Sequence, residues 1–191
     1  MLGKMGVLLV AGLALSPVRA GAAEIVLARS GVEKLVTQAL FRDHGRLTLA
    51  PAPCASYLDQ PSVSLSGGRI HIRSHLTARV GFAVNADCVG IGLASWTTVS
   101  GTPVSAGGKV RLEDIRIDEV DDPDTRTLLV NSGLSGALPK AVELDIQSAV
   151  RTLLVQSVDQ IQATVESFSF QDVSVVNDTL SMRFDFKLVG R

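Results

Sequence analysis

The chain has 191 residues, of which 46% are hydrophobic and only 4% aromatic, and its formal net charge is -1. Such a balance argues against nucleic-acid binding, which is typical of strongly basic domains. The length corresponds to one ordinary domain, and its interior must be built mainly from valine, leucine and isoleucine.

The N-terminus has the pattern of a secretory signal peptide. Lys4 precedes an apolar run from Gly6 to Leu15, and small residues follow. The run is shorter than the roughly 20 apolar residues that span a bilayer. We expect residues 1–23 to be a signal peptide, cleaved after Ala20 or Ala23, and residues 24–191 to be one domain. No cysteine lies near either site for lipid attachment, so we predict a soluble periplasmic protein.

The two cysteines, Cys54 and Cys88, would meet an oxidising compartment after export. A disulfide bond between them would stabilise the fold by about 3.8 kcal/mol in the chain-entropy model. The alternative is two buried free thiols. No histidine stands at metal-ligand spacing from either cysteine, so we expect no metal or other cofactor.

The first part of the domain combines a short helix with strands. A strand is predicted over residues 24–28. Ser30 and Glu33 have the spacing of a capping box, and apolar residues behind them repeat at helical spacing, which predicts a helix over residues 31–41. Gly45 then ends it.

Residues 46–120 alternate with the period of strands. Ser66-Gly67-Gly68 is a hairpin turn signal. Further predictions are a strand over residues 89–99, a turn region over residues 102–108 and a bulge at Asp114, where the alternation slips by one residue. The strand after the hairpin turn has an apolar face and a basic face: Ile70, Ile72, Leu76, Ala78 and Val80 against Arg69, His71, Arg73, His75 and Arg79.

The basic face has two interpretations. Arg69, Arg73 and Arg79 are candidates for contact with anionic lipid headgroups, and the histidines would strengthen such binding as the pH falls. Alternatively, the row is the solvated face of a strand, paired with acidic neighbours such as Glu113, Asp118 and Glu119. Arginine on an outer strand also discourages edge-to-edge pairing.

The stretch from Pro139 to Ala163 is predicted to be a long helix. Its apolar arc covers roughly 240° of the helix, against about 100° for an ordinary surface helix. Residues 121–139 before it are irregular, with a possible helical turn from Asp122-Pro123 through Leu129. After it, residues 168–175 and 180–188 are predicted to form a hairpin around Asn177-Asp178.

These elements predict an α+β fold in which a curved antiparallel β-sheet wraps around one long C-terminal helix, with a short N-terminal helix. Their order resembles one module of the tubular lipid-binding (TULIP) superfamily, and most closely the small YceB-like bacterial envelope lipoproteins. The resemblance rests on residues 32–40, 70–80, 142–161 and 168–188. Unlike those lipoproteins, the chain has no lipobox cysteine.

The resemblance implies a lipid or similar apolar ligand in a slot between the long helix and the concave sheet. We therefore expect non-catalytic periplasmic lipid binding and carriage across the envelope, with contact to an anionic membrane surface or an envelope protein as a further expectation. The expected lining residues are Val142, Ile146, Val150, Leu153, Leu154, Ile72, Leu76, Phe184 and Phe186.

Two alternatives stay open from the sequence. The first is a structural or interaction protein of the bacterial envelope with a filled core, because packed and hollow interiors share one hydrophobic pattern. The second is an enzyme of unrecognised type, which we do not expect because no nucleophile elbow or phosphate-binding loop is present. The cluster Asp121, Asp122 and Asp124 lacks the full set of oxygen ligands that calcium requires.

Overall fold

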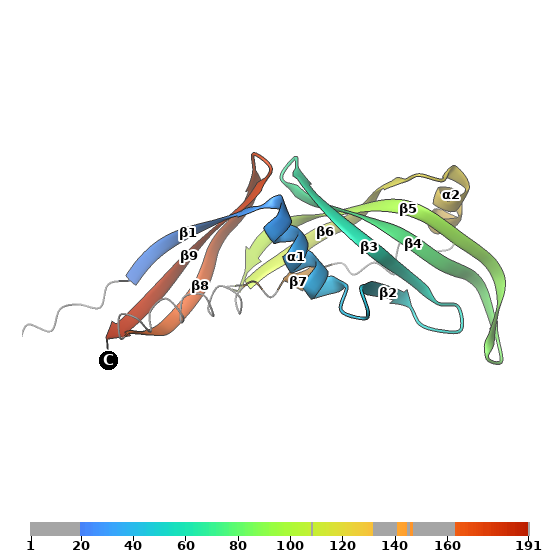
Figure 1. The fold of residues 1–191 in the computed structure, drawn as a ribbon, viewed down its shortest axis with the longest axis horizontal. Coiled ribbons are helices and arrows are strands. Elements are labelled where there is room, and N and C mark those ends of the chain that lie inside the picture. The colour runs from blue at the N-terminus through green and yellow to red at the C-terminus, as the bar shows by residue number, and fades with distance from the viewer. Residues whose placement is uncertain (1–19, 108, 132–140, 145, 147–162, 191) are drawn as a thin grey trace, which may run out of the picture.

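The computed structural model describes residues 20–107, 109–131, 141–144, 146 and 163–190, and Figure 1 shows its fold. The described elements, in chain order, are β1 (Ala20–Ala28), α1 (Arg29–Leu40), β2 (Arg46–Ala50), β3 (Ser56–Ser66), β4 (Arg69–Val84), β5 (Asp87–Ala106), β6 (Lys109–Val120), α2 (Pro123–Asn131), β7 (Ala141–Leu144), β8 (Ala163–Val176) and β9 (Thr179–Gly190). They form a three-stranded sheet, β1-β9-β8, and a six-stranded sheet, β2-β3-β4-β5-β6-β7. All neighbouring strands are antiparallel.

The two sheets follow one another along the long axis of the molecule, and α1 crosses where they meet (Figure 1). Val32 and Val36, one turn apart on α1, are fully buried. They belong to one hydrophobic cluster that also contains Ile70 of the larger sheet and Met182 of the smaller one. The helix therefore joins both sheets into a single core.

The predicted fold class is wrong in its central element. The described residues are mostly strand, their two helices are 12 and 9 residues long, and no long C-terminal helix is among them. A curled antiparallel sheet is present, as predicted (Figure 1). The described helices that pack against the larger sheet are the N-terminal α1 and the short α2, which bury Val32 and Val36 and Leu129, respectively, in its core.

The start of the expected helix, residues 141–144, is instead the edge strand β7. Leu144 pairs with Val110 of β6, and Val142 pairs with Leu112. Val142 and Leu144 are separated by the exposed Glu143, a pattern that suits a strand as well as a helix. The strand is favoured over the helix because the backbone groups on the outer side of β6 need hydrogen-bond partners, which residues 141–144 provide as a strand. Of the rest of the expected helix, Ile146 is described and Ala163 belongs to β8, whereas residues 139–140, 145 and 147–162 lie outside the described residues.

Helix α1 confirms a predicted helix but not its predicted cap. It starts at Arg29 rather than residue 31, and its N-cap is Ala28, whose side chain makes no capping hydrogen bond. Ser30 thus lies inside the first turn. The carboxylate of Glu33 accepts a hydrogen bond from the backbone amide of Val63 at 3.1 Å, which ties α1 to β3.

The strand predictions hold for most of the sheet. Asp114 lies in the predicted bulge with φ at 50°, and the β5–β6 register shifts beside it. Asn177 and Asp178 both have positive φ, as a two-residue type I′ hairpin requires. The turn predicted over residues 102–108 is wrong in extent, because β5 continues to Ala106. Pro103 lies in this extension opposite Leu112 of β6 and beyond the β5 residues that pair with β4, where a residue without a backbone N–H is tolerated.

The predicted disulfide bond between Cys54 and Cys88 is present, with the Cα atoms 5.0 Å apart. It joins the segment before β3 to the start of β5. Disulfide bonds of this kind persist in oxidising compartments. Among the described residues, no helix has the length and apolar character needed to cross a membrane.

Candidate functional site: an apolar groove on the inner face of the large sheet

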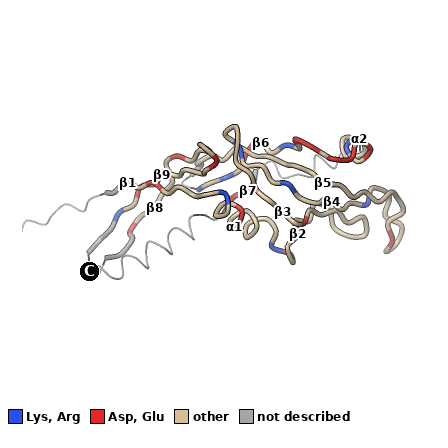
Figure 2. The backbone as a smooth tube through the Cα atoms, turned by 45° about the horizontal axis from the view of Figure 1, so that its top comes forward, with Lys and Arg blue, Asp and Glu red and all other residues tan. Residues whose placement is uncertain are grey.

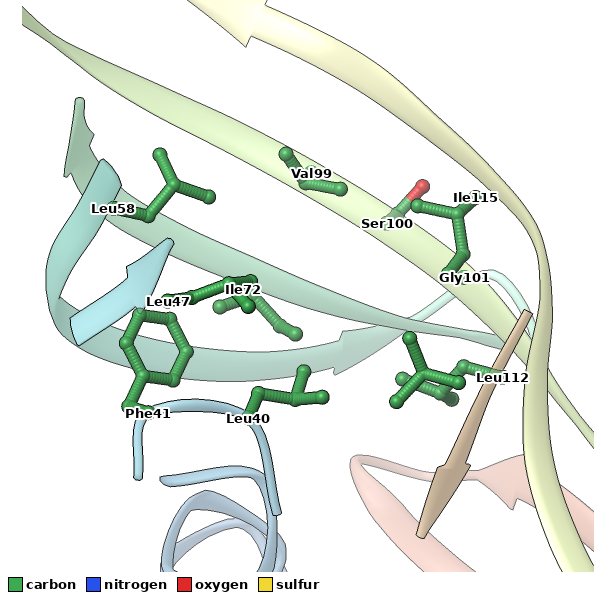
Figure 3. A pocket seen from close by; sticks show the side chains of 11 residues that line it. Leu40, Phe41, Leu47, Leu58, Ile72, Val99, Ser100, Gly101, Leu112 and Ile115 are labelled. Atoms are coloured by element: carbon green, nitrogen blue, oxygen red, sulfur yellow. The ribbon is translucent and has the colours of Figure 1, made fainter. Parts of the chain in front are cut away.

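An apolar groove lies on the inner face of the six-stranded sheet, the face that bears Ile72 and Leu76, and we call it the central groove. Its side chains converge from the end of α1 and from successive strands, as Figure 3 shows. The cavity within it measures about 30 Å³ and is lined by Leu40, Phe41, Leu47, Leu58, Ile72, Val99, Ser100, Gly101, Leu112, Ile115 and Val142. The lining contains no charged residue.

A glycine opposite the β6 bulge keeps space in the groove. A β-carbon added to Gly101 would lie 3.2 Å from the β-carbon of Leu112 and 3.4 Å from Cγ1 of Ile115. The bulge at Asp114 brings these two side chains toward β5, since two residues of β6 there stand opposite one residue of β5. The missing side chain of Gly101 therefore leaves room that any other residue would occupy.

A second, smaller cavity of about 10 Å³ continues the apolar surface toward α2. Leu58 and Val99 border both cavities. The remaining lining residues are Leu49, Leu76, Thr97, Ile117 and Leu129. Together the two cavities mark one apolar surface that runs from the end of α1 to α2.

The structure brings together some of the predicted lining residues. Ile72 and Val142 line the central groove, and Leu76 lines the second cavity. Ile146 is buried in the core, with 1% of its surface exposed, but borders neither cavity. The predicted residues Val150, Leu153 and Leu154 lie outside the described residues.

Phe184 and Phe186 lie on β9, in the smaller sheet, and not in the groove. They belong to an aromatic cluster with Phe168 and Phe170 of β8. The ring centroids of Phe168 and Phe184 are 4.8 Å apart, and those of Phe168 and Phe170 are 5.1 Å apart. The four phenylalanines of the C-terminal hairpin therefore contact one another and also pack in the hydrophobic core, to which Phe170 and Phe184 belong.

Sequence reasoning missed several groove residues, including Leu40, Leu58 and Val99. Alternation does place Val99 and the residues two positions from it on one face of a strand. It does not tell which strands become neighbours in the sheet. Leu58 was not predicted for a further reason, which is an irregularity in β3. The backbone of Gln60 has positive φ, and the β3–β4 register shifts just beyond Asp59. The shift breaks the alternation that would have revealed the strand.

Arg69 is the most buried member of the basic strand face. Only 11% of its side chain is exposed. Its guanidinium donates to the hydroxyl and carbonyl oxygens of Ser100, to the hydroxyl of Thr102, and to the carboxylate and carbonyl oxygens of Asp114, at 2.6–3.3 Å. Arg69 therefore holds the β6 bulge against β5.

The other members of the basic face also have partners. Nδ1 of His71 lies 3.0 Å from the Asp118 carboxylate, and Nδ1 of His75 lies 3.6 Å from that of Asp59. Arg73 donates to Asp121 at 2.6 Å, and Nη1 of Arg79 donates to the carbonyl oxygen of Cys88 at 3.2 Å. This arrangement favours the paired, solvated face over a face reserved for anionic headgroups, although of the expected acidic partners only Asp118 takes part.

The acidic residues near α2 have structural roles. Burial opposes the ionisation of Asp118, but hydrogen bonds from Ser100, His71 and Arg116 outweigh it and lower its pKa. Asp122 accepts a hydrogen bond from the backbone amide of Thr125 at 2.7 Å, as an N-cap does. Hydrogen bonds from the side chain and then the backbone amide of Thr125 lower the pKa of Asp122. Over the described ranges, no group of three or more histidine, cysteine or acidic side chains has the geometry to hold a metal ion.

The far end of the β4–β5 hairpin is a second apolar surface. Its side chains are Phe82, Val84, Val89 and Ile91, with 81%, 50%, 60% and 58% of their surface exposed. Figure 2 shows that this end of the hairpin carries little charge, in contrast to β6 and the approach to α2. We call these four residues the hairpin tip.

The fold and the groove together define a mainly β protein with an apolar, uncharged groove under a curled antiparallel sheet. Comparison of the sequence with models of known protein families and with curated proteins gives no match.

Proposed function

We propose that this protein binds an acyl chain or a similar apolar ligand in the central groove, without catalysis, in the periplasm. The observation that carries this proposal is the uncharged lining of the groove, which aliphatic side chains from α1 and from strands β2 to β7 provide. Several of its walls, among them Leu47, Ile115 and Val142, are only half buried. Covering them would remove apolar surface from water.

The energetics suit a chain-like ligand. Burial of one methylene group stabilises a complex by about 0.8 kcal/mol, so a chain of about ten methylenes could offset the several kcal/mol lost on association. The preformed cavity of about 30 Å³ is far below the roughly 300–1,000 Å³ of typical ligand pockets. The ligand must therefore lie along the open groove or move its half-buried walls apart.

The disulfide bond and the signal-peptide pattern support a periplasmic location. A soluble carrier in that compartment would take its ligand from one membrane and release it at another. The first test is native mass spectrometry of the mature protein purified from the periplasm, followed by lipid extraction. A stoichiometric bound lipid supports the proposal.

A matched pair of variants locates the ligand. Leu47→Lys places a charge in the groove wall, and Ile91→Lys places the same charge on the hairpin tip. Both variants must keep the circular dichroism spectrum of the wild type. Loss of the bound lipid in Leu47→Lys but not in Ile91→Lys supports binding in the groove; equal retention in both variants contradicts it.

The second candidate function is that of an interaction protein of the envelope with a filled core. The small cavities and the exposed hairpin tip favour it, since contiguous exposed apolar residues often mark interaction sites. A clean mass without bound lipid, unchanged after incubation with envelope lipids, would support this function over lipid binding.

A further inference from the structure

Among the buried hydroxyl groups on the inner face of the large sheet, two are neighbours in adjacent strands. Ser74 of β4 and Thr97 of β5 stand directly opposite each other in the sheet register. Only 1% and 3% of their surfaces are exposed. Within the described part of the chain, neither hydroxyl oxygen has a hydrogen-bond partner.

Such a pair is costly unless something satisfies it. A buried hydroxyl without a hydrogen bond loses its bonds to water and gains none in return. Most buried polar side chains in folded proteins do have a partner. One member of the pair belongs to the site described above: Thr97 lines the second cavity together with Leu76 and Val99, and Ser74 stands beside Thr97 in the sheet.

We propose that Ser74 and Thr97 recognise a neutral carbonyl group of the ligand, such as that of an acyl ester or amide. This inference rests on the proposed function of the groove. A hydroxyl group can donate to a carbonyl oxygen, and side chains directly opposite in antiparallel strands have β-carbons about 4.5–5.5 Å apart. Both hydroxyls can therefore approach one oxygen atom.

The surroundings favour a neutral carbonyl over a carboxylate. Neither cavity is lined by a charged residue, and a buried carboxylate without a counter-ion is strongly unfavourable. The basic neighbours of Ser74, Arg73 and His75, lie on the opposite face of β4, beside Asp121 and Asp59 respectively. They cannot neutralise a charge on the inner face.

The position of the pair also suits an acyl chain. Gly101 lies four residues beyond Thr97 on β5, which corresponds to about 13 Å along the strand. Val99, between them, borders both cavities. A carbonyl group at the hydroxyl pair would thus allow the hydrocarbon chain to run along the inner face into the central groove.

The test compares an ester with an alkane of equal chain length. The oxidised full-length mature protein is loaded with the neutral fluorescent probe N-phenyl-1-naphthylamine, and displacement by methyl decanoate and by dodecane is measured. We expect the wild type to prefer the ester. Ser74→Ala and Thr97→Val should each weaken ester binding about five- to tenfold, the loss expected for one hydrogen bond, and leave dodecane binding within about twofold.

Stability provides an independent readout. Because the hydroxyls of Ser74 and Thr97 are unpartnered, their removal should leave the denaturation midpoint unchanged or raise it. The matched control is Ser95→Ala, on the same face of β5. The Ser95 hydroxyl accepts from the backbone amide of Asp122 at 3.1 Å and donates to the carbonyl oxygen of Trp96 at 3.2 Å, so its removal should lower the midpoint.

The outcomes separate this inference from the proposed function. If dodecane displaces the probe but the ester is not preferred, the groove binds apolar ligands and the carbonyl inference is wrong. If Ser74→Ala and Thr97→Val lower the midpoint as much as Ser95→Ala, an internal partner such as a buried water already satisfies the pair, which also overturns the inference. If the probe binds and neither compound displaces it, the proposed function itself fails.

Discussion

Replacement of Arg69 tests the role of the buried guanidinium at the β6 bulge. Arg69→Ala removes five donated hydrogen bonds, two of them to the backbone carbonyl oxygens of Ser100 and Asp114. Ser100 is only 1% exposed, so water cannot easily replace the lost donors. The bulge would then lack the contacts that hold it against β5.

The expected cost follows from these contacts. Five hydrogen bonds at about 1 kcal/mol each, less about 2 kcal/mol for the side-chain entropy that the variant no longer loses, give about 3 kcal/mol of destabilisation. The ion pair itself contributes little of this. The carboxylate of Asp114 is 69% exposed, and exposed ion pairs are worth about 0–1 kcal/mol.

Urea denaturation of the oxidised protein, monitored by circular dichroism, measures the effect. Asp114→Asn removes only the charge, and asparagine tolerates the positive φ at this position, so its cost should stay below about 1 kcal/mol. Arg73→Ala is the matched control, since its side chain is 43% exposed and donates to Asp121 alone among the described carboxylates. Equal midpoints for Arg69→Ala and Arg73→Ala would refute this account of the buried arginine.

Three further predictions concern other parts of the fold. Cys54→Ser opens a disulfide that spans 34 residues of sequence and should lower the free energy of unfolding by about 3.8 kcal/mol; a midpoint equal to that of the oxidised wild type would contradict this. A β-carbon at Gly90 would overlap the carbonyl oxygen of Val80, whereas one at Gly92 meets nothing within 4 Å. Gly90→Ala should therefore destabilise the protein by about 1–3 kcal/mol, and Gly92→Ala should be neutral or slightly stabilising. Thermal melts that rank the two variants the other way would exclude the close approach of the two strands. The pKa of Asp118 lies below its ordinary value of 3.8, so its contribution to stability is complete above about pH 4 and is lost as the pH falls through the folded-state pKa. Asp118→Asn should therefore weaken the acid dependence of the denaturation midpoint between about pH 5 and pH 2. An unchanged dependence of the midpoint on pH would argue against a hydrogen-bonded carboxylate at Asp118.

The strands and their faces were largely predictable from the sequence. Ile70 and Ile72 alternate with Arg69 and His71, and a strand that buries one face requires such a pattern. The Asn177-Asp178 hairpin was also predictable, because these residue types tolerate the positive φ that its turn imposes. Local chemistry alone sets these features.

The sequence pattern did not predict how the arginines on one strand face differ in burial. Arg69, Arg73 and Arg79 look alike in the sequence, yet only Arg69 is nearly buried, because the β6 bulge folds over it. The bulge at Asp114 was predicted, but its contact with a residue 45 positions earlier was not. Contacts of this kind depend on which strands become neighbours.

The sequence by itself determined the alternation of the strands, their main turns and the pair of cysteines that forms the disulfide, because these depend on residues close in sequence or on residue type alone. Only the tertiary structure decided that Val142 and Leu144 join a sheet edge rather than begin a helix, and that Leu58 and Val99 share one apolar surface. The physical reason is that a hydrophobic pattern specifies which side chains avoid water but not which partners cover them. The backbone groups at the edge of β6, which need hydrogen-bond partners, decide the first of these features, and the register of the five other strands of the sheet decides the second.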